Sequence, residues 1–139
     1  MSDDIKFVQK GWGFEKIIVN NDKYCGKILY FVKGKRCSLH YHKLKQETFF
    51  IESGRLEINY YADYSLVEDC MNKRKKPEEE DAMTYCLRCT LHKEVLGPGD
   101  KFEVPIGMAH SMYALRDTKM YEFSTTHDDS DSYRIFKGD

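Results

Sequence analysis

The sequence predicts an all-β fold, a sandwich or barrel, in a chain of 139 residues. Short β-rich segments recur between Gly, Pro, Asn and Asp turns about every 8–12 residues, which is typical of such folds. A parallel α/β sheet would need long amphipathic helices between the strands, and the sequence contains no such pattern. Hydrophobic residues make up 41% of the chain, enough to form a core. The predicted strands are 14–20, 27–33, 47–52, 55–61, 84–96, 111–115 and 119–125.

One segment interrupts this series of strands. Residues 62–83 contain a run of basic residues, then Pro77, then a run of acidic residues. We expect a charged loop or short helix inserted between two strands, with a lid or partner-binding segment as the alternative. No repeat or linker divides the rest, so we expect one domain over 1–139.

The charge balance and the chain start exclude several classes of protein. There are 22 basic and 23 acidic residues, a formal net charge of −1. This balance predicts no nucleic-acid partner and no anionic membrane partner. No apolar run approaches the roughly 20 residues that a membrane-spanning helix needs. The opening MSDDIKFVQK lacks the apolar region of a secretory signal. We therefore expect a cytoplasmic protein.

The cysteines have no spacing typical of a small secreted protein, and we expect free thiols. They are Cys25, Cys37, Cys70, Cys86 and Cys89. A structural zinc site that combines Cys70, the Cys-x-x-Cys pair at 86 and 89 and His92 is the alternative. Positions 86 and 89 would face opposite sides of the predicted strand, which argues against that site.

Two segments of the sequence bring together ligand-type side chains. His40 and His42 are two residues apart, so on a strand they project from one face. We expect a short turn to return the chain antiparallel, so that Glu47 opens the adjacent strand. Farther along, a Pro-Ile-Gly turn delivers His110 to the start of another strand. The four side chains can then converge on one point.

Three imidazoles and one carboxylate suit a single divalent transition metal, namely Zn, Mn, Fe, Ni or Co. Four protein ligands leave up to two positions of an octahedral ion open for substrate or water, as catalysis requires. Single histidines in a barrel are usually ordinary core or surface residues. Three of the five histidines fall at matched spacing around glycines and a proline, which makes coincidence a poor explanation.

These segments resemble the two motifs of the cupin family. The first motif is matched at every spacing, and the second departs only where Ala114 replaces an Asn that is not a ligand in the family. The resemblance implies a double-stranded β-helix, or jelly-roll barrel, in which His40, His42, Glu47 and His110 bind the metal. The matching positions are Gly34, His40, His42, Glu47 and Gly54 in the first motif, and Gly99, Pro105, Gly107 and His110 in the second.

The beginning and the end of the chain resemble one branch of cupins more closely. The opening GWGFEKIIVNNDKYCGKILYF is similar to the start of mannose-6-phosphate isomerase-type cupins, and the tail EFSTTHDDSDSYRI is similar to the ends of sugar-isomerase cupins. The resemblance implies metal-dependent isomerisation of a sugar or sugar phosphate. The matching positions in the opening are Trp12, Gly13, Glu15, Tyr24 and Lys27.

Two residues outside the motifs are candidates for catalysis. Glu122 shares a strand face with Met120 and is a candidate general base if that face is the inner one; if it faces outward, it is a solvated charge. Lys27 begins a strand, can point either way, and is the second candidate. Lys43 and Lys45 are predicted to lie exposed in the turn after the paired histidines, with contact to a sugar phosphate as the alternative.

The sequence therefore predicts a metal-dependent aldose–ketose isomerase that acts on a small sugar or sugar phosphate. Two other hypotheses remain open: an Fe(II) dioxygenase using the same ligands, and a binding module that senses a sugar without catalysis. A homodimer formed through sheet faces is possible.

Overall fold

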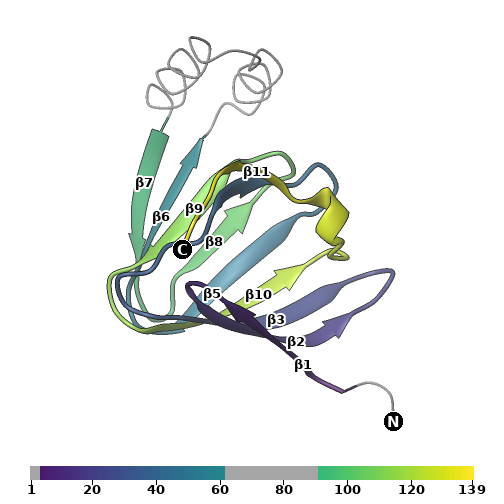
Figure 1. Ribbon diagram of the computed structural model, residues 1–139, viewed down its shortest axis with the longest axis horizontal. Helices are drawn as coiled ribbons and strands as arrows, with labels where there is room; N and C mark the ends of the chain where they lie inside the picture. The colour runs from purple at the N-terminus through teal and green to yellow at the C-terminus, as the bar shows by residue number, and fades with distance from the viewer. Residues whose placement is uncertain (1–3, 62–90) are drawn as a thin grey trace.

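The computed structural model describes residues 4–61 and 91–139, and these form two antiparallel sheets that face each other (Figure 1). Within the described residues there is one short 3₁₀ helix, η1 (Asp129–Asp131). The strands are β1 (Lys6–Lys10), β2 (Gly13–Asn20), β3 (Cys25–Phe31), β4 (Leu39–Tyr41), β5 (Glu47–Ser53), β6 (Leu56–Tyr61), β7 (Leu91–Leu96), β8 (Lys101–Val104), β9 (His110–Ala114), β10 (Thr118–Ser124) and β11 (Tyr133–Phe136).

The order of the strands confirms the predicted jelly roll. One sheet has the order β1-β2-β3-β10-β5-β8 and the other has the order β11-β4-β9-β6-β7. Neighbours in a sheet often lie far apart in the sequence, as when β10 pairs with β3 on one side and β5 on the other. Such long-range pairing, with successive strands passing between two packed sheets, is the architecture of a double-sheet barrel.

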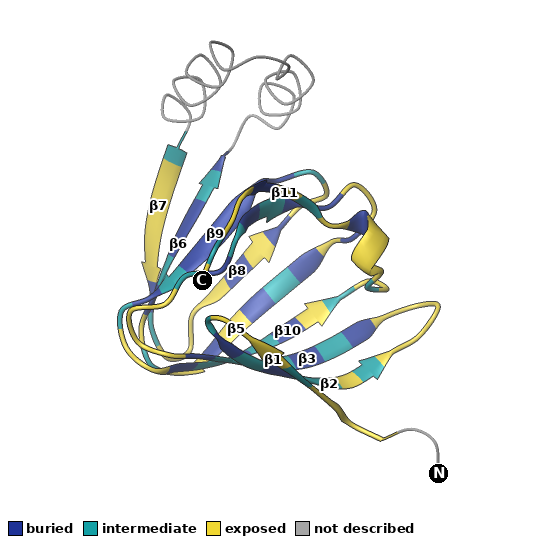
Figure 2. Ribbon diagram, in the orientation of Figure 1, coloured by how far each residue is buried: buried dark blue, intermediate teal, exposed yellow. Residues whose placement is uncertain are grey.

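Strand alternation explains which side chains lie between the sheets (Figure 2). Along β3, every second residue from Cys25 to Phe31 is buried, and the residues between them are partly exposed. Because successive side chains of a strand point to opposite faces, each strand contributes one inward row. The apolar part of these rows forms the main core, in which Phe49, Ile51, Leu56, Ile58 and Met120 are fully buried.

The inward rows change from apolar to ionisable along their length. On β10 the buried residue after Met120 is Glu122, and on β5 the buried residue two before Phe49 is Glu47. These strands are neighbours, with Glu122 opposite Phe49 in the register. The space between the sheets therefore has an apolar end, where the core packs, and an ionisable end, where the candidate site lies.

The cupin motif glycines occupy turns that need them. Gly54 lies between β5 and β6 with φ +99°, a conformation that residues with a Cβ rarely adopt. A Cβ at this position would stand 2.3 Å from the backbone oxygen of Asp117. Gly54 therefore permits the tight connection between β5 and β6, which lie in opposite sheets.

One part of the predicted topology was wrong. We expected the chain to return after His42 so that Glu47 opens a strand next to the histidines. Instead, β4 lies between β11 and β9, whereas β5 lies between β10 and β8 in the other sheet. Residues 42–46 cross from one sheet to the other, so the histidines and Glu47 face each other across the barrel.

Three strands were not predicted, β1, β8 and β11, and β4 was expected only as the strand that carries the paired histidines. Each of the three is four or five residues long and lies at the edge of its sheet, so its periodicity is weak. The predicted strand 84–96 is described only from Leu91 on, and the predicted insertion 62–83 lies outside the described residues.

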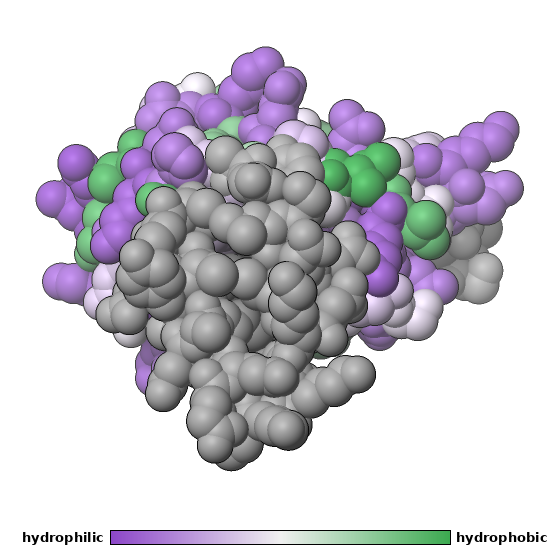
Figure 3. Space-filling view, turned by 90° about the horizontal axis from the view of Figure 1, so that it is seen from above, coloured by the Kyte–Doolittle hydropathy of each residue, from purple (hydrophilic) through white to green (hydrophobic). Residues whose placement is uncertain are grey.

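The surface has a polar character on the side seen from above. In Figure 3 the described side chains of this face are mainly hydrophilic, with hydrophobic ones in a few small groups. Among the described residues, no helix is long and apolar enough to cross a membrane.

Candidate metal centre

A cavity of about 650 Å³ occupies the ionisable end of the barrel. It lies between the two sheets, and the 3₁₀ helix η1 and the residues after β11 form part of its wall. All six predicted site residues line it. They are Lys27, His40, His42, Glu47, His110 and Glu122.

The histidines come together on the five-stranded sheet. His40 on β4 is the register partner of His110, the first residue of β9. The His40 ring lies 4.6 Å from the His110 ring and 5.1 Å from the His42 ring, measured between centroids. His42 and His110 are buried, with exposed fractions of 4% and 0%. His40 and His42, two residues apart, thus both place their rings on the cavity side, as predicted.

The three imidazoles share one kind of hydrogen bond, from Nδ1 to a backbone oxygen. The Nδ1 atoms of His40, His42 and His110 lie 2.9, 3.0 and 3.0 Å from the backbone oxygens of Ser38, Asp131 and Met108. A carbonyl oxygen can only accept a hydrogen bond, so each neutral ring carries its proton on Nδ1 and donates it there. Each Nε2 is left with a free lone pair. Metal-binding histidines typically have this arrangement, in which a backbone carbonyl fixes the tautomer.

Burial favours the neutral form of His40 and His42. Desolvation, together with the neighbouring His110, lowers the pKa of His40 to about 3. The pKa of His42 is also lowered by burial, although the Glu47 carboxylate opposes the change. A metal ligand must be unprotonated, so the two rings are in the form that can bind an ion at neutral pH.

Glu47 faces the imidazoles from the opposite sheet. Its Oε2 lies 3.2 Å from Nε2 of His110, and its Oε1 lies 3.7 Å from Nε2 of His42. Burial alone would raise the pKa of Glu47, but a hydrogen bond from His110 in its protonated form and the Lys45 ammonium hold it well below its ordinary value. Glu47 is therefore a carboxylate.

The facing atoms are all electron-pair donors. When His110 is neutral, with its proton on Nδ1 facing the Met108 oxygen, neither Nε2 of His110 nor Oε2 of Glu47 has a hydrogen to offer the other. Both atoms, and Nε2 of His42, are buried without a hydrogen-bond partner. Buried polar atoms without partners are costly, and a cation between these lone pairs would relieve the cost. The donor set of nitrogens and a carboxylate fits a divalent transition metal.

The arrangement is not a closed coordination shell. Among residues 4–61 and 91–139, no three His, Cys, Asp or Glu side chains are placed so that they could hold an ion as they stand. Glu47 divides its oxygens between His110 and Lys45, whose ammonium lies 2.9 Å from Oε1. The metal assignment of the four residues therefore stays a prediction.

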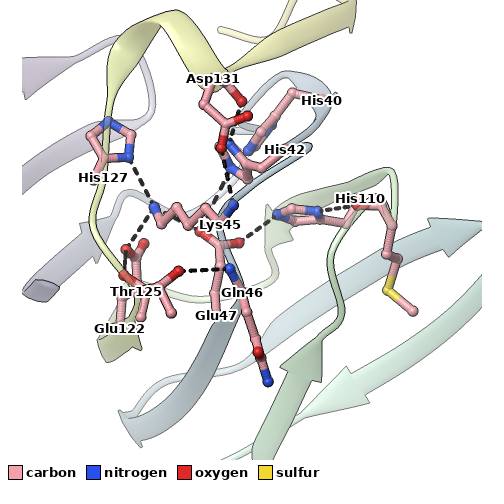
Figure 4. A network of polar contacts seen from close by, with 12 residues as sticks. His40, His42, Lys45, Gln46, Glu47, His110, Glu122, Thr125, His127 and Asp131 are labelled. Atoms are coloured by element: carbon pink, nitrogen blue, oxygen red, sulfur yellow. Dashed lines mark hydrogen bonds and ion pairs between the residues drawn. The ribbon is translucent and has the colours of Figure 1, made fainter. Parts of the chain in front are cut away.

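The prediction that Lys45 is exposed was wrong. Only 3% of Lys45 is exposed, and its Nζ lies 2.8 Å from Oε2 of Glu122 as well as 2.9 Å from Oε1 of Glu47 (Figure 4). Burial would lower the pKa of this ammonium, but the two carboxylates outweigh burial and raise it. Lys45 is therefore a buried cation between the two sheets. Residues 42–46 cross the barrel, and Lys43 and Leu44 are exposed there, as predicted for Lys43, whereas Lys45 points inward.

Asp131, which the sequence analysis missed, holds this crossing segment in place. Its carboxylate accepts hydrogen bonds from the backbone N–H groups of Lys43, Leu44 and Lys45, at 2.9 to 3.2 Å. Its backbone oxygen accepts from Nδ1 of His42. One buried residue of η1 thus orients a candidate ligand and the segment that carries Lys45.

The two candidate catalytic residues lie on adjacent strands. Glu122 points inward and is 4% exposed; its Oε2 also accepts a hydrogen bond from the Ser124 hydroxyl, at 3.0 Å. Lys27 is the register partner of Glu122, is 4% exposed, and lies 3.6 Å from Oε1 of Glu15. Each has a partner of opposite charge, as buried charges require.

His127 is the second residue that the sequence analysis missed. Its Nδ1 lies 3.0 Å from Nζ of Lys45, and its Nε2 lies 2.8 Å from Oδ1 of Asp129. The resemblance of the tail EFSTTHDDSDSYRI to sugar-isomerase cupins was the available signal. It did not indicate which tail residues reach the cavity.

The described cysteines are free and buried. Cys25 and Cys37 are both unpaired, and burial raises the pKa of the Cys37 thiol to about 12. The alternative zinc site depends on Cys70, Cys86 and Cys89, which lie outside the described residues. Its fourth candidate, His92, stacks on Tyr60 with ring centroids 5.4 Å apart.

The two sheets, the motif glycines and the facing histidines define a cupin. A family model described as Cupin matches residues 3–138, and the chain belongs to that family. This confirms the resemblance derived from the two motifs.

A relative with an assigned activity is the D-lyxose/D-mannose isomerase of Thermosediminibacter oceani. It is 25% identical to this chain over 122 residues. The match covers 84% of this chain and 63% of that enzyme, so the chain spans less than two thirds of its relative's length.

Solved structures show the same fold at low sequence identity. KdgF from Halomonas sp. has a TM-score of 0.62 and 16% identity, and the match covers 91% of each chain. CapF from Staphylococcus aureus has a TM-score of 0.68 and 14% identity, over 97% of this chain and 32% of that one. Oxalate decarboxylase from Bacillus subtilis has a TM-score of 0.67 and 13% identity, over 95% and 30%.

Proposed function

We propose that this cupin is a metal-dependent aldose–ketose isomerase of small sugars. The observation that carries the proposal is the Lys45–Glu122 ion pair, buried in one cavity with three imidazoles and a carboxylate. A buried acid–base pair beside a set of metal-type ligands is what proton transfer next to a carbonyl needs. The distant relationship to a D-lyxose/D-mannose isomerase supports the same class of reaction.

The proposed ligands are His40, His42, Glu47 and His110. Their free Nε2 lone pairs and the ionised carboxylate support the assignment, and a related fold, that of oxalate decarboxylase, is described with Mn(II) centres. A bound divalent ion would supply Lewis-acid polarisation of the sugar carbonyl. The identity of the metal stays open among Zn, Mn, Fe, Ni and Co.

The residues of the chain would move the protons. Converting an aldose to a ketose transfers one hydrogen from C2 to C1 and one from the C2 hydroxyl to the C1 oxygen, with no net oxidation. Glu122, as a carboxylate, would take the C2 proton and return it to C1. The Lys45 ammonium, held beside Glu122, would stabilise by its charge the negative charge that develops as the proton leaves.

Lys27, the second candidate for catalysis, lies beside Glu122 as its register partner on the neighbouring strand. Because its ammonium is 4% exposed and lies 3.6 Å from Glu15, we assign it to orienting a sugar hydroxyl or Glu122 within the cavity. Replacing Lys27 should raise KM or lower kcat while leaving the bound metal in place.

The charges of the cavity favour a neutral sugar over a sugar phosphate. The deeply buried cations of the described residues, Lys27 and Lys45, already contact Glu15, Glu47 and Glu122. A phosphate placed among them would be repelled by three carboxylates. The other basic residues that line the cavity, Lys10, Arg134 and Lys137, are exposed to solvent.

The homodimer remains a prediction, with one supporting feature. The outer face of the six-stranded sheet carries exposed aromatic side chains, including Phe7, Phe50 and Phe123. Phe7 stacks on Phe14, and Phe50 stacks on Tyr121, so the aromatic side chains continue across several strands. Size-exclusion chromatography with light scattering would measure the oligomeric state.

The test is proton exchange. Metal-free protein would be loaded with each candidate ion and incubated with D-mannose, D-lyxose and their phosphates in D₂O, and deuterium at C1 and C2 followed by NMR. We expect exchange with a free sugar, and a fall of about 10²–10⁴-fold in Glu122→Gln with unchanged metal content. The matched control is Glu52→Gln on β5, whose carboxylate is exposed.

The other two hypotheses are distinct outcomes of this experiment. Oxygen consumption with Fe(II) and no sugar exchange would replace the isomerase with a dioxygenase. Sugar binding without exchange or oxygen uptake, under every ion, would leave a sensor.

A further inference from the structure

The ammonium of Lys45 has a complete set of acceptors. Its three hydrogens can be matched to Oε1 of Glu47 at 2.9 Å, Oε2 of Glu122 at 2.8 Å and Nδ1 of His127 at 3.0 Å (Figure 4). An ammonium has three donors and no acceptor. The first two contacts are to carboxylates of the proposed site. The third is to a histidine that is not among the proposed metal ligands.

The tautomer of His127 follows from its two contacts. Nδ1 must accept, because the only group that it faces at hydrogen-bond distance among the described residues, the Lys45 ammonium, can only donate. The proton therefore lies on Nε2, which donates to Oδ1 of Asp129 at 2.8 Å. This is the opposite tautomer to that of His40, His42 and His110, whose protons lie on Nδ1.

The backbone of His127 is also fixed. Its N–H donates to Oδ1 of Asn20 at 3.0 Å, and its carbonyl oxygen accepts from Nδ2 of Asn20 at 2.9 Å. Asn20 is the last residue of β2, so the hairpin of the six-stranded sheet anchors the segment after β10. A ring that only filled space would need neither the two backbone hydrogen bonds with Asn20 nor a carboxylate that accepts from Nε2.

We propose that His127 and Asp129 form a positioning pair that holds the Lys45 ammonium between Glu47 and Glu122. Asp129 fixes the tautomer, and Nδ1 of His127 takes the third ammonium hydrogen, which would otherwise be buried without a partner. Without the pair, a long flexible lysine side chain has only two carboxylates to set its place. The catalytic consequence rests on the proposed isomerase, but the positioning itself does not.

The structural test needs no activity. In ¹⁵N-labelled protein, the Lys45 ammonium should give a protected ¹H–¹⁵N signal, since it is buried and fully bonded. His127 should show an unprotonated Nδ1 and a protonated Nε2. We expect His127→Leu to abolish the Lys45 signal and His127→Asn to retain it, because the Asn side-chain oxygen can occupy the position of Nδ1. Loss of the signal in neither variant, or the Nδ1-protonated tautomer, would overturn the proposal.

A double-variant comparison separates positioning from simple packing. Asp129→Ala should weaken the Lys45 signal in the wild-type background and have no further effect in His127→Asn, which has no tautomer to fix. Equal effects in both backgrounds would contradict the proposal. The matched control is Asp128→Ala, which removes the cap of η1 at Ser130 but no contact of the His127 ring.

Activity provides the second measurement. If the isomerase is confirmed, His127→Leu should lower kcat at least 10-fold with little change in KM, and His127→Asn should recover most of it, as expected of a group that acts on Lys45 and not on the sugar. An equal loss of kcat in both variants would show that His127 acts only through packing. If the wild type shows no isomerisation, the proposed function fails while the NMR results still decide the positioning pair.

Discussion

Replacing Lys45 with methionine tests whether the buried cation is what keeps two carboxylates inside the barrel. The side chains of Lys45, Glu47 and Glu122 are only 2 to 5% exposed, so water screens them little. Removing one partner of a buried ion pair typically costs about 3–5 kcal/mol, because the other charge is left without compensation. Methionine keeps the length of the side chain, so the loss reports charge more than volume.

The expected shift is large enough to measure by urea denaturation of the metal-free protein. With a urea dependence of about 2 kcal/mol/M for a domain of this size, a loss of about 3–5 kcal/mol lowers the midpoint by about 1.5–2.5 M. Lys101→Met is the matched control, since the contact of Lys101 with Glu103 is 68% and 70% exposed and should contribute little.

The lowered pKa of Glu47 predicts how the loss of stability in the Lys45→Met variant changes with pH. The wild-type pKa of Glu47 is held low, so its carboxylate stabilises the fold above the ordinary pKa and loses this contribution as the pH falls through the lowered one. Without Lys45, burial is no longer offset, and the carboxylates destabilise the fold when ionised. The deficit of the variant should therefore be greatest near pH 7 and shrink on acidification. An unchanged midpoint, or a deficit independent of pH, would refute Lys45 as their counter-ion.

Three further outcomes are expected. Purified protein should bind close to one divalent ion per chain, and His42→Ala or His110→Ala should sharply lower that occupancy, measured by mass spectrometry of the metal, while the circular dichroism of the fold is kept. Asp131→Ala removes the acceptor of three backbone N–H groups and should weaken metal affinity about 10–100-fold in a chelator competition. Cys37, with a pKa of about 12, should resist a thiol reagent at pH 8 until the chain is unfolded. Rapid reaction of the native protein would contradict this prediction. Full metal occupancy in the His42 variant would contradict the metal assignment.

The fold was predictable because its signals are local. The period of two in segments such as 27–33 and 119–125 marks strands that are buried on one face. The motif glycines mark turns, as the positive φ of Gly54 illustrates. The strands β1, β8 and β11 were missed because each is too short, or too exposed, for alternation to be read. The pairing of β10 with both β3 and β5 depends on contacts that no local pattern encodes.

The composition of the site was predictable in part. The histidine spacing and Glu47 could be read from the motif, and the alternation of β10 placed Glu122 on the face of Met120 without saying that this face points inward. In the structure that face points inward, and Glu122 is buried. Asp131 and His127 were missed because they act through the backbone of a distant segment and through a lysine, 82 or more residues away in sequence.

Lys45 shows why a turn could not be told from a crossing. The segment after His42 was expected to be a surface turn because lysines at such positions are usually exposed. A jelly roll, however, passes successive strands between its two sheets, so the connecting residues can run along the cavity. The sequence carried a signal for this: Lys45 and Glu47 are two residues apart, the same spacing as His40 and His42, and residues so spaced tend to share a face where the chain is extended. The inward pair of imidazoles thus predicts an inward lysine beside Glu47, once the chain is known to cross and Asp131 is available to bind the backbone of the crossing segment.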